Sequence, residues 1–468
     1  MEQSLTLISA QVQFMAQDDR LALVHIPLDL YPYFLTPILQ LLFHDVPPID
    51  ESSEAYDGDP AFLNFSITPV ECSIMCSRHL ANQYFSPLVE RFLQANSATQ
   101  SRPSISQDDF IAMQVYGEGL EAGQRVLELT SPLAMAGISI FFISTYFADY
   151  IIVPLRSKAQ VIQALESRGF RFEMSTEAFI NSNNNQFPFA SSLSPSSSRS
   201  SSSMSSPPAT PPPSSLEELQ TRTFSSLRRN HIVPCVDKSL RLVQCAAHHR
   251  YSSEVSSISI LREALTVMLV VDKPRFLSLT MTAADPAASL LLEKRLLPRF
   301  SSDPAAMVDP DEETSLLLGP KEEILVPIML DLRSLPLEAT GIVCGVASRL
   351  ADATRRDDLT DASTILSSSY HGSSSFEGSF KNIFSSSLGS GGPVQPPGPS
   401  FGRKAPGNGY PATHHLQPDL GPSMDAVEIS FLSTARAGTI IVGEHELHRA
   451  VHALEAESHE PETSELGM

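Results

Sequence analysis

The hydrophobic pattern of residues 140–166 returns near the C-terminus, at residues 429–455, without a gap. The two segments read IFFISTYFADYIIVPLRSKAQVIQALE and ISFLSTARAGTIIVGEHELHRAVHALE, and equivalent positions such as Thr145 and Thr434 are 289 residues apart. Each segment alternates apolar and small residues, runs apolar after a turn, and then changes to helical spacing. Because a duplicated segment forms the same supersecondary element twice, both copies are predicted to be strand, turn, strand and helix.

A further strand and helix are predicted before each copy. Before the first copy, Phe110–Tyr116 has the composition of a strand, and Gln124–Met135 places its apolar residues on one face of a helix. Before the second copy, Ile324–Leu332 predicts a strand and Thr340–Leu350 a helix. The pattern therefore indicates two βαββα units, each closed by a fourth strand.

The rest of the apolar sequence predicts two weaker copies. The strand, helix and paired strands of the first are expected at Leu5–Met15, Tyr33–Phe43 and Phe62–Met75. Those of the second are expected at Leu240–Cys245, Ile258–Leu269 and Phe276–Thr282. The predicted fold class is α+β, with tandem ferredoxin-like βαββαβ domains.

Composition divides the chain between these units. Units 1 to 4 are predicted over residues 1–105, 106–178, 234–300 and 320–456. A Ser/Pro-rich linker over 179–233, an insertion in unit 4 at about 355–424 and an acidic tail over 457–468 complete the chain. These connections contain too few apolar residues to offset their ordering entropy, so they are predicted to be disordered.

Charge and cysteine content narrow the functional class. The net charge of −21, from 53 acidic and 32 basic residues, argues against a nucleic-acid partner or an anionic membrane surface. Glu2 follows Met1 and no basic stretch precedes an apolar one, so no signal peptide is expected and the predicted location is the cytoplasm. The five cysteines are then expected to be free thiols.

Neither a metal site nor a membrane span is expected. Cys72, Cys76 and His79 resemble zinc ligands only loosely, and a half-buried strand explains them better. The most apolar stretch, residues 131–155, is interrupted by polar residues, and its second copy carries Glu428 and Arg436. Two buried strands therefore explain this stretch better than a helix across a membrane.

Catalytic signatures are lacking in the sequence. It contains no G-x-S-x-G, no P-loop, no dinucleotide fingerprint and no H-E-x-x-H. Small modules joined by flexible connections are typical of a sensor or an adaptor, so the protein is expected to be non-catalytic and to need no cofactor.

A βαββαβ unit with Gly-Ile-Ser-Ile after its first helix is similar to the ACT domain, an amino-acid-binding regulatory module. Ser131–Val153, Thr340–Leu350 and Ile429–Val442 together resemble the CASTOR family of cytosolic arginine sensors, which have four ACT units and act upstream of the TOR growth pathway. Its animal members are compact, so the serine-rich insertions suggest a distant fungal relative.

The resemblance implies an amino acid bound between units 2 and 4. The residues implied to hold it are Ala136, Gly137, Ser139, Ile140, Glu338, Gly341, Ile342, Thr434 and Ala435. The turn around Gly137 can direct N–H groups at a ligand, and the helix start at Gly341 can hold a carboxylate. The alternative is that these glycines only serve tight turns.

Two positions depart from the family. Ala339 stands where the family contacts the ligand's α-amino group with Glu, and Gly438 stands where an Asp pairs with the guanidinium. Without that carboxylate a bidentate contact is missing, so arginine is not expected to be the best ligand. Arg436, nearby, leaves an acidic or a neutral ligand open.

The family's partner-binding motif is matched by Tyr146 and Asp149 but not by Phe147. Alternatively, Tyr146 is a core residue and Asp149 a turn residue. Three functional hypotheses follow: an amino-acid sensor in TOR-type nutrient control that acts through a protein partner, a ligand-free ACT scaffold, and a regulatory subunit of an amino-acid biosynthetic enzyme. ACT units commonly pair, so a homodimer is also plausible.

Overall fold

The computed structural model describes residues 11–14, 20–43, 62–95, 102–116, 122–172, 212–248, 255–285, 287–300, 317–353 and 429–455. All of them fall in one compact unit, and the second unit, Arg356–Asp425, lies outside the described residues. The predicted insertion, the acidic tail and most of the predicted linker therefore also lie outside them.

Units 1 and 2 are ferredoxin-like, as predicted. Unit 1 comprises β2 (Leu21–Ile26), α1 (Tyr31–Leu42), β3 (Phe62–Ile67), β4 (Cys72–Ser77), α2 (Arg78–Tyr84), α3 (Ser86–Ala95) and β5 (Ser104–Ile105). Its antiparallel strand order is β5–β2–β4–β3. Unit 2 comprises β6 (Phe110–Tyr116), α4 (Ala122–Met135), β7 (Phe141–Ser144), β8 (Asp149–Pro154), the short helix η1 (Leu155–Ser157), α5 (Lys158–Glu166) and β9 (Arg171–Phe172).

Unit 3 repeats this order, and unit 4 repeats it as far as α10, with which the described residues end. Unit 3 comprises β11 (Leu242–His248), α8 (Val255–Val267), the π-helical turn η2 (Met268–Asp272), β12 (Leu277–Thr282), β13 (Ala287–Glu293), the 3₁₀ helix η3 (Lys294–Phe300) and β14 (Leu317–Leu318). Unit 4 comprises β15 (Leu325–Asp331), a helix over 342–353, β16 (Ile429–Ser433), β17 (Ala437–Gly443) and α10 (Leu447–Glu455). The α+β fold class is confirmed.

Two strands belong to other units than predicted. The strand expected at Leu5–Met15 is β1 (Gln11–Phe14), and it pairs with β6 of unit 2, not with unit 1. It also runs parallel to β9, and its Val12 enters the core of unit 2. Likewise β10 (Cys235–Val236), which precedes unit 3, pairs with β15 of unit 4. Unit 1 begins instead with β2, whose nearly continuous apolar run sequence analysis missed.

The range predicted as the linker contains a helix, α7 (Leu216–Arg229). Ser215 caps it by accepting a hydrogen bond from Glu218 N at 3.1 Å, a capping arrangement typical of helix starts. Its buried Phe224 and Leu227 pack into the core that units 2 and 4 share. The Ser/Pro-rich composition just before α7 concealed it, so the predicted linker extends too far.

The units join edge to edge in pairs. β3 pairs with β12, with Phe65 opposite Leu279, and β7 meets β16 at Ile143 and Leu432, which are equivalent residues of the duplicated segment. The two extended sheets face each other across an apolar cluster, in which the rings of Phe62 and Tyr150 lie 5.2 Å apart.

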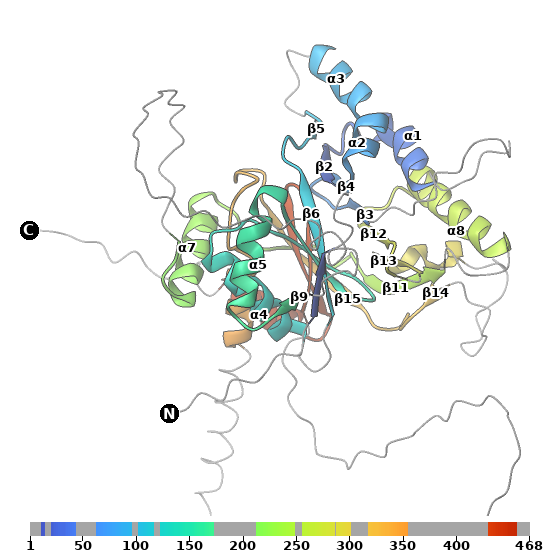
Figure 1. Ribbon diagram of the computed structural model, residues 1–468. Helices are drawn as coiled ribbons and strands as arrows, with labels where there is room; N and C mark the ends of the chain where they lie inside the picture. Colours follow the sequence, from blue (N-terminus) through green and yellow to red (C-terminus); the bar gives the residue numbers. More distant parts are fainter. Residues whose placement is uncertain are drawn as a thin grey trace, which may run out of the picture. The chain divides into compact units, whose positions relative to one another are not determined.

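Helices cover the outer face of each sheet. Helices α1, α2 and α8 pack on units 1 and 3, and α4, α5, α7, α10 and the helix over 342–353 pack on units 2 and 4 (Figure 1). Residues 131–155 form the end of α4 and the two buried strands, as predicted. In the described part of the chain, no helix is long and apolar enough to cross a membrane.

Candidate functional site

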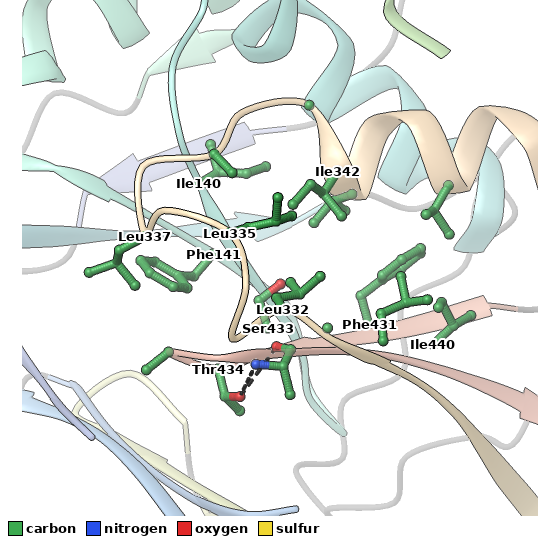
Figure 2. Close-up of a pocket in the computed structure, with 18 of the residues that line it drawn as sticks. Ile140, Phe141, Leu332, Leu335, Leu337, Ile342, Phe431, Ser433, Thr434 and Ile440 are labelled. Carbon is green, nitrogen blue, oxygen red and sulfur yellow. Dashed lines mark hydrogen bonds between the residues drawn. The ribbon is translucent and has the colours of Figure 1, made fainter. Parts of the chain in front are cut away.

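A cavity of about 60 Å³ lies in unit 4, where unit 2 contributes part of its wall. Its lining comes from the segment after α4, the loop after β15, the start of the following helix and the β16–β17 hairpin (Figure 2). The lining residues are Ile140, Phe141, Leu330, Leu332, Leu335, Pro336, Leu337, Ala339, Gly341, Ile342, Val343, Val346, Phe431, Ser433, Thr434, Ala435, Ala437, Gly438 and Ile440. None of these residues carries a charge, and Ser433 and Thr434 supply the side-chain hydroxyls.

The β16–β17 turn fixes one wall. Thr434 Oγ1 lies 3.2 Å from both the backbone N and the backbone O of Ala437, which closes the turn (Figure 2). The same hydroxyl donates to Glu71 Oε1 of unit 1 at 2.6 Å. The Thr434 side chain is therefore held from two sides, and its polar atom is already partnered.

The loop between β15 and the next helix forms the opposite wall, and Arg436 holds it. Leu332 N donates to the carbonyl of Arg436 at 2.8 Å, and the Arg436 guanidinium donates to the carbonyl of Leu335 at 3.4 Å. The helix starts after Gly341, which has φ +79° and whose absent Cβ would lie 2.8 Å from Leu219 Cδ1. Both the backbone conformation and the packing of α7 therefore require glycine there.

Five of the residues predicted by resemblance line this cavity: Ile140, Gly341, Ile342, Thr434 and Ala435. Ser139 and Glu338 line a neighbouring cavity of about 220 Å³ instead. There the Arg156 guanidinium donates to Asp108 at 2.6 Å and to Glu338 at 3.1 Å, and all three side chains are exposed.

Ala136 and Gly137 form the turn that ends α4. Ile138 N donates to Leu133 O at 3.0 Å, and Gly137 takes φ +71°, as expected for a glycine that ends a helix. The carbonyl of Ala136 accepts from Gln160 at 2.8 Å. The turn at the end of α4 therefore accounts for the described contacts of Ala136 and Gly137.

The two predicted partner-binding residues differ in accessibility. Tyr146 is 37% exposed at the β7–β8 turn, and its backbone N donates to Ser289 Oγ at 2.7 Å. Asp149 is buried and accepts from Arg125 Nε at 2.6 Å. Tyr146 is thus partly accessible to solvent, whereas the Asp149 carboxylate is buried and paired within the chain.

Sequence reasoning missed two buried acids, Glu71 in unit 1 and Asp285 in unit 3. Glu71 is fully buried and receives hydrogen bonds from His25, Thr434 and the backbone N of Arg436. Burial and the Glu71 charge together raise the pKa of the adjacent Cys72 thiol. A lone acid between two apolar runs, as in ITPVECSIMC, was the one available signal.

The second buried acid is Asp285. Its carboxylate accepts from Tyr150 at 2.6 Å and from Gln114 at 3.2 Å. Burial raises the pKa of Asp285, and these hydrogen bonds oppose the rise. Within the described residues, no three His, Cys, Asp or Glu side chains gather as metal ligands would.

Comparison with known proteins places an ACT domain in unit 2. The ACT domain family matches residues 105–167, from the end of β5 through α5. No curated protein matches the chain.

The solved structures that match this chain do so at low identity and low TM-score. Aspartate kinase from Synechocystis is 12% identical, with 98% of this chain and 57% of that one covered and a TM-score of 0.27. The ligand-free regulatory subunit of aspartate kinase from Thermus thermophilus is 11% identical, with 35% and 99% covered and a TM-score of 0.24. A Vibrio cholerae protein of unknown function is 18% identical, with 35% and 93% covered and a TM-score of 0.20.

Proposed function

We propose that the protein is a non-catalytic regulator that binds an uncharged amino acid with an apolar side chain in the cavity of unit 4. The observation that carries this proposal is the cavity wall, which offers carbon and two hydroxyls and no charged side chain. A buried guanidinium without a carboxylate would lose its hydration uncompensated, so arginine fits poorly. A volume of 60 Å³ holds about five water-sized groups, close to the carbon count of a leucine or isoleucine side chain.

The carboxylate and ammonium groups of such a ligand can be placed at the start of the helix over 342–353. The first turn of the helix over 342–353 has backbone N–H groups without partners in the helix, and its dipole favours a carboxylate. Glu338, one residue before Ala339, is the acid of this loop, and its ion pair with Arg156 is exposed and therefore weak. In the proposal Glu338 exchanges Arg156 for the ammonium of the ligand.

The ACT match in unit 2 and the resemblance of units 2 and 4 to the CASTOR family support a signalling role. In this proposal, ligand binding changes the affinity of the protein for a protein partner in TOR-type nutrient control. The exposed Tyr146 belongs to the surface that contacts this partner. A ligand can shift such an equilibrium only by its difference in affinity for the two states.

Calorimetry of the full chain with each of the twenty common amino acids tests the proposal. We expect leucine, isoleucine, valine or methionine to bind best, and arginine to bind at least about ten times more weakly, because one charge-assisted contact is missing. Tight binding of arginine would contradict the assigned ligand class. Binding of none of the twenty would instead favour a ligand-free scaffold.

A further inference from the structure

The carboxylate of Glu71 links unit 1 to the cavity in unit 4. Glu71 sits in a tight turn between β3 and β4, in which Thr68 N donates to Glu71 O at 2.9 Å and Glu71 N donates to Thr68 Oγ1 at 3.3 Å. From this fixed turn the side chain reaches the β16–β17 hairpin, where it accepts from Thr434 Oγ1 and Arg436 N. His25 of β2 donates to the other oxygen.

Both cavity walls depend on the residues that Glu71 holds. Thr434 and Ala435 line one wall directly. Arg436 fixes the other wall, because its carbonyl binds Leu332 N and its guanidinium binds the Leu335 carbonyl. A series of hydrogen bonds therefore runs from unit 1, through one buried acid, to both sides of the cavity.

We infer that Glu71 is a positioning residue, which sets the shape of the cavity from a unit that contributes no lining residue to it. The inference rests on the proposed function, since it concerns the same cavity. Hydrogen bonds to a buried charge are stronger than neutral ones, and removing the shared acceptor releases three donors at once. Ligand affinity in unit 4 then depends on the arrangement of unit 1.

The pseudo-symmetric acid provides a matched control. Asp285 occupies the corresponding turn of unit 3, where its backbone N donates to Thr282 Oγ1 at 3.0 Å. Asp285 is also buried between the two sheets, but its carboxylate binds Tyr150 and Gln114 of unit 2. Replacing it removes a comparable buried acid and leaves the cavity contacts in place.

The experiment compares Glu71→Ala, Glu71→Gln and Asp285→Ala in the full chain. Affinity for leucine is measured by calorimetry, and backbone exchange at residues 330–345 and 430–440 is measured by hydrogen–deuterium mass spectrometry without ligand. We expect Glu71→Ala to weaken leucine binding about tenfold or more and to raise exchange in both segments. Glu71→Gln, which keeps an acceptor oxygen, should restore most of the affinity. Asp285→Ala should lower the melting temperature but change the affinity less than about twofold.

Equal losses of affinity in Glu71→Ala and Asp285→Ala would overturn the inference and leave the proposed function standing, provided the wild type binds leucine. If the wild type binds no amino acid, the proposed function fails, and the exchange measurement still decides whether Glu71 orders the hairpin and the loop. If Glu71→Ala does not fold, Glu71→Asp decides, because it keeps the buried acid but shortens its reach to Thr434 and Arg436. Exchange raised in both segments would support the inference, and exchange unchanged from the wild type would overturn it.

Discussion

The two copies of the duplicated segment share a backbone and use it differently. A threonine closes both hairpins: Thr145 Oγ1 donates to Ala148 O at 2.7 Å, and Thr434 Oγ1 lies 3.2 Å from Ala437 O. In the first copy the turn presents Tyr146 to solvent, whereas in the second copy the equivalent Ala435 lines the cavity. The same turn is therefore exposed to solvent in one unit and lines a cavity in the other.

Asp149 and Gly438 are also equivalent positions, because each stands opposite the last serine of the preceding strand. In the first copy, the buried Asp149 carboxylate binds the guanidinium of Arg125. In the second copy no carboxylate occupies the position, and apolar side chains surround the space. The first copy thus pairs a buried acid with a guanidinium of the same chain, whereas in the second copy a glycine at the equivalent position lines the cavity.

The largest expected effect comes from removing the Arg125–Asp149 ion pair of the first copy. Arg125→Met leaves Asp149 buried without its cation, which should lower the free energy of unfolding by about 3 kcal/mol. Arg156→Met is the control, because it removes an arginine from exposed ion pairs and should cost less than about 1 kcal/mol. Urea denaturation measures both. Similar values for the two variants would mean that the Asp149–Arg125 pair adds no more than a surface pair.

The next effect distinguishes the two threonines. Thr434→Val removes a donor to the buried Glu71 and should cost about 2 kcal/mol, since hydrogen bonds to charged groups are the stronger kind. Thr145→Val removes the same turn contacts at a half-buried site and should cost about 1 kcal/mol. Denaturation of both variants under one set of conditions checks this. A larger cost at Thr145 would contradict the role assigned to Glu71.

A third test reverses the difference at Gly438. A Cβ at this position would meet only Leu332 Cδ1, at 3.5 Å, so a side chain can be introduced. Gly438→Asp supplies the carboxylate that Asp149 supplies in the first copy, and it should shift the ratio of arginine to leucine affinity about tenfold toward arginine. Gly438→Asn, equal in size and uncharged, is the control. If both variants shift the ratio equally, size and not charge sets the preference.

The smallest effect concerns the pH dependence of Asp285. Burial raises its folded-state pKa above 3.8, so the folded protein binds the proton more tightly than the unfolded chain does. The stability from this group is present at low pH and is lost as the pH rises from 3.8 through the folded pKa. Asp285→Asn should therefore gain stability relative to the wild type as the pH rises above 3.8.

Asp331 offers a control of opposite sign. The hydrogen bond from Arg333 lowers the pKa of Asp331, so its contribution is present above the unfolded pKa and is lost as the pH falls through the folded one. Asp331→Asn should accordingly lose stability relative to the wild type as the pH rises. Parallel curves for the Asp285→Asn and Asp331→Asn variants would contradict both assignments. Chemical denaturation of both variants at a series of pH values measures these changes in the free energy of unfolding.

Local pattern predicted most of the strands and helices but not how all of them pair. Alternation and helical spacing are properties of neighbouring residues, so elements such as β7, β8 and α4 could be derived directly. The pairing of β1 with β6 depends on a partner about a hundred residues away, which no local pattern encodes. Glu71 is a similar case, because its importance arises from Thr434 and Arg436, far along the chain. Resemblance found five cavity residues because they sit where a helix and a hairpin begin and end.

The placement of β1 and β10 has a consequence for dissecting the protein. Residues 105–167, which match the ACT domain, would by themselves present β6 with an unpaired edge, since β1 normally covers it. An open edge strand invites pairing with other chains and aggregation. Unit 4 would be similarly exposed without β10, which precedes unit 3 in the chain. Units 2 and 4 each therefore need a strand from outside their own βαββα sequence to cover one edge of their sheet.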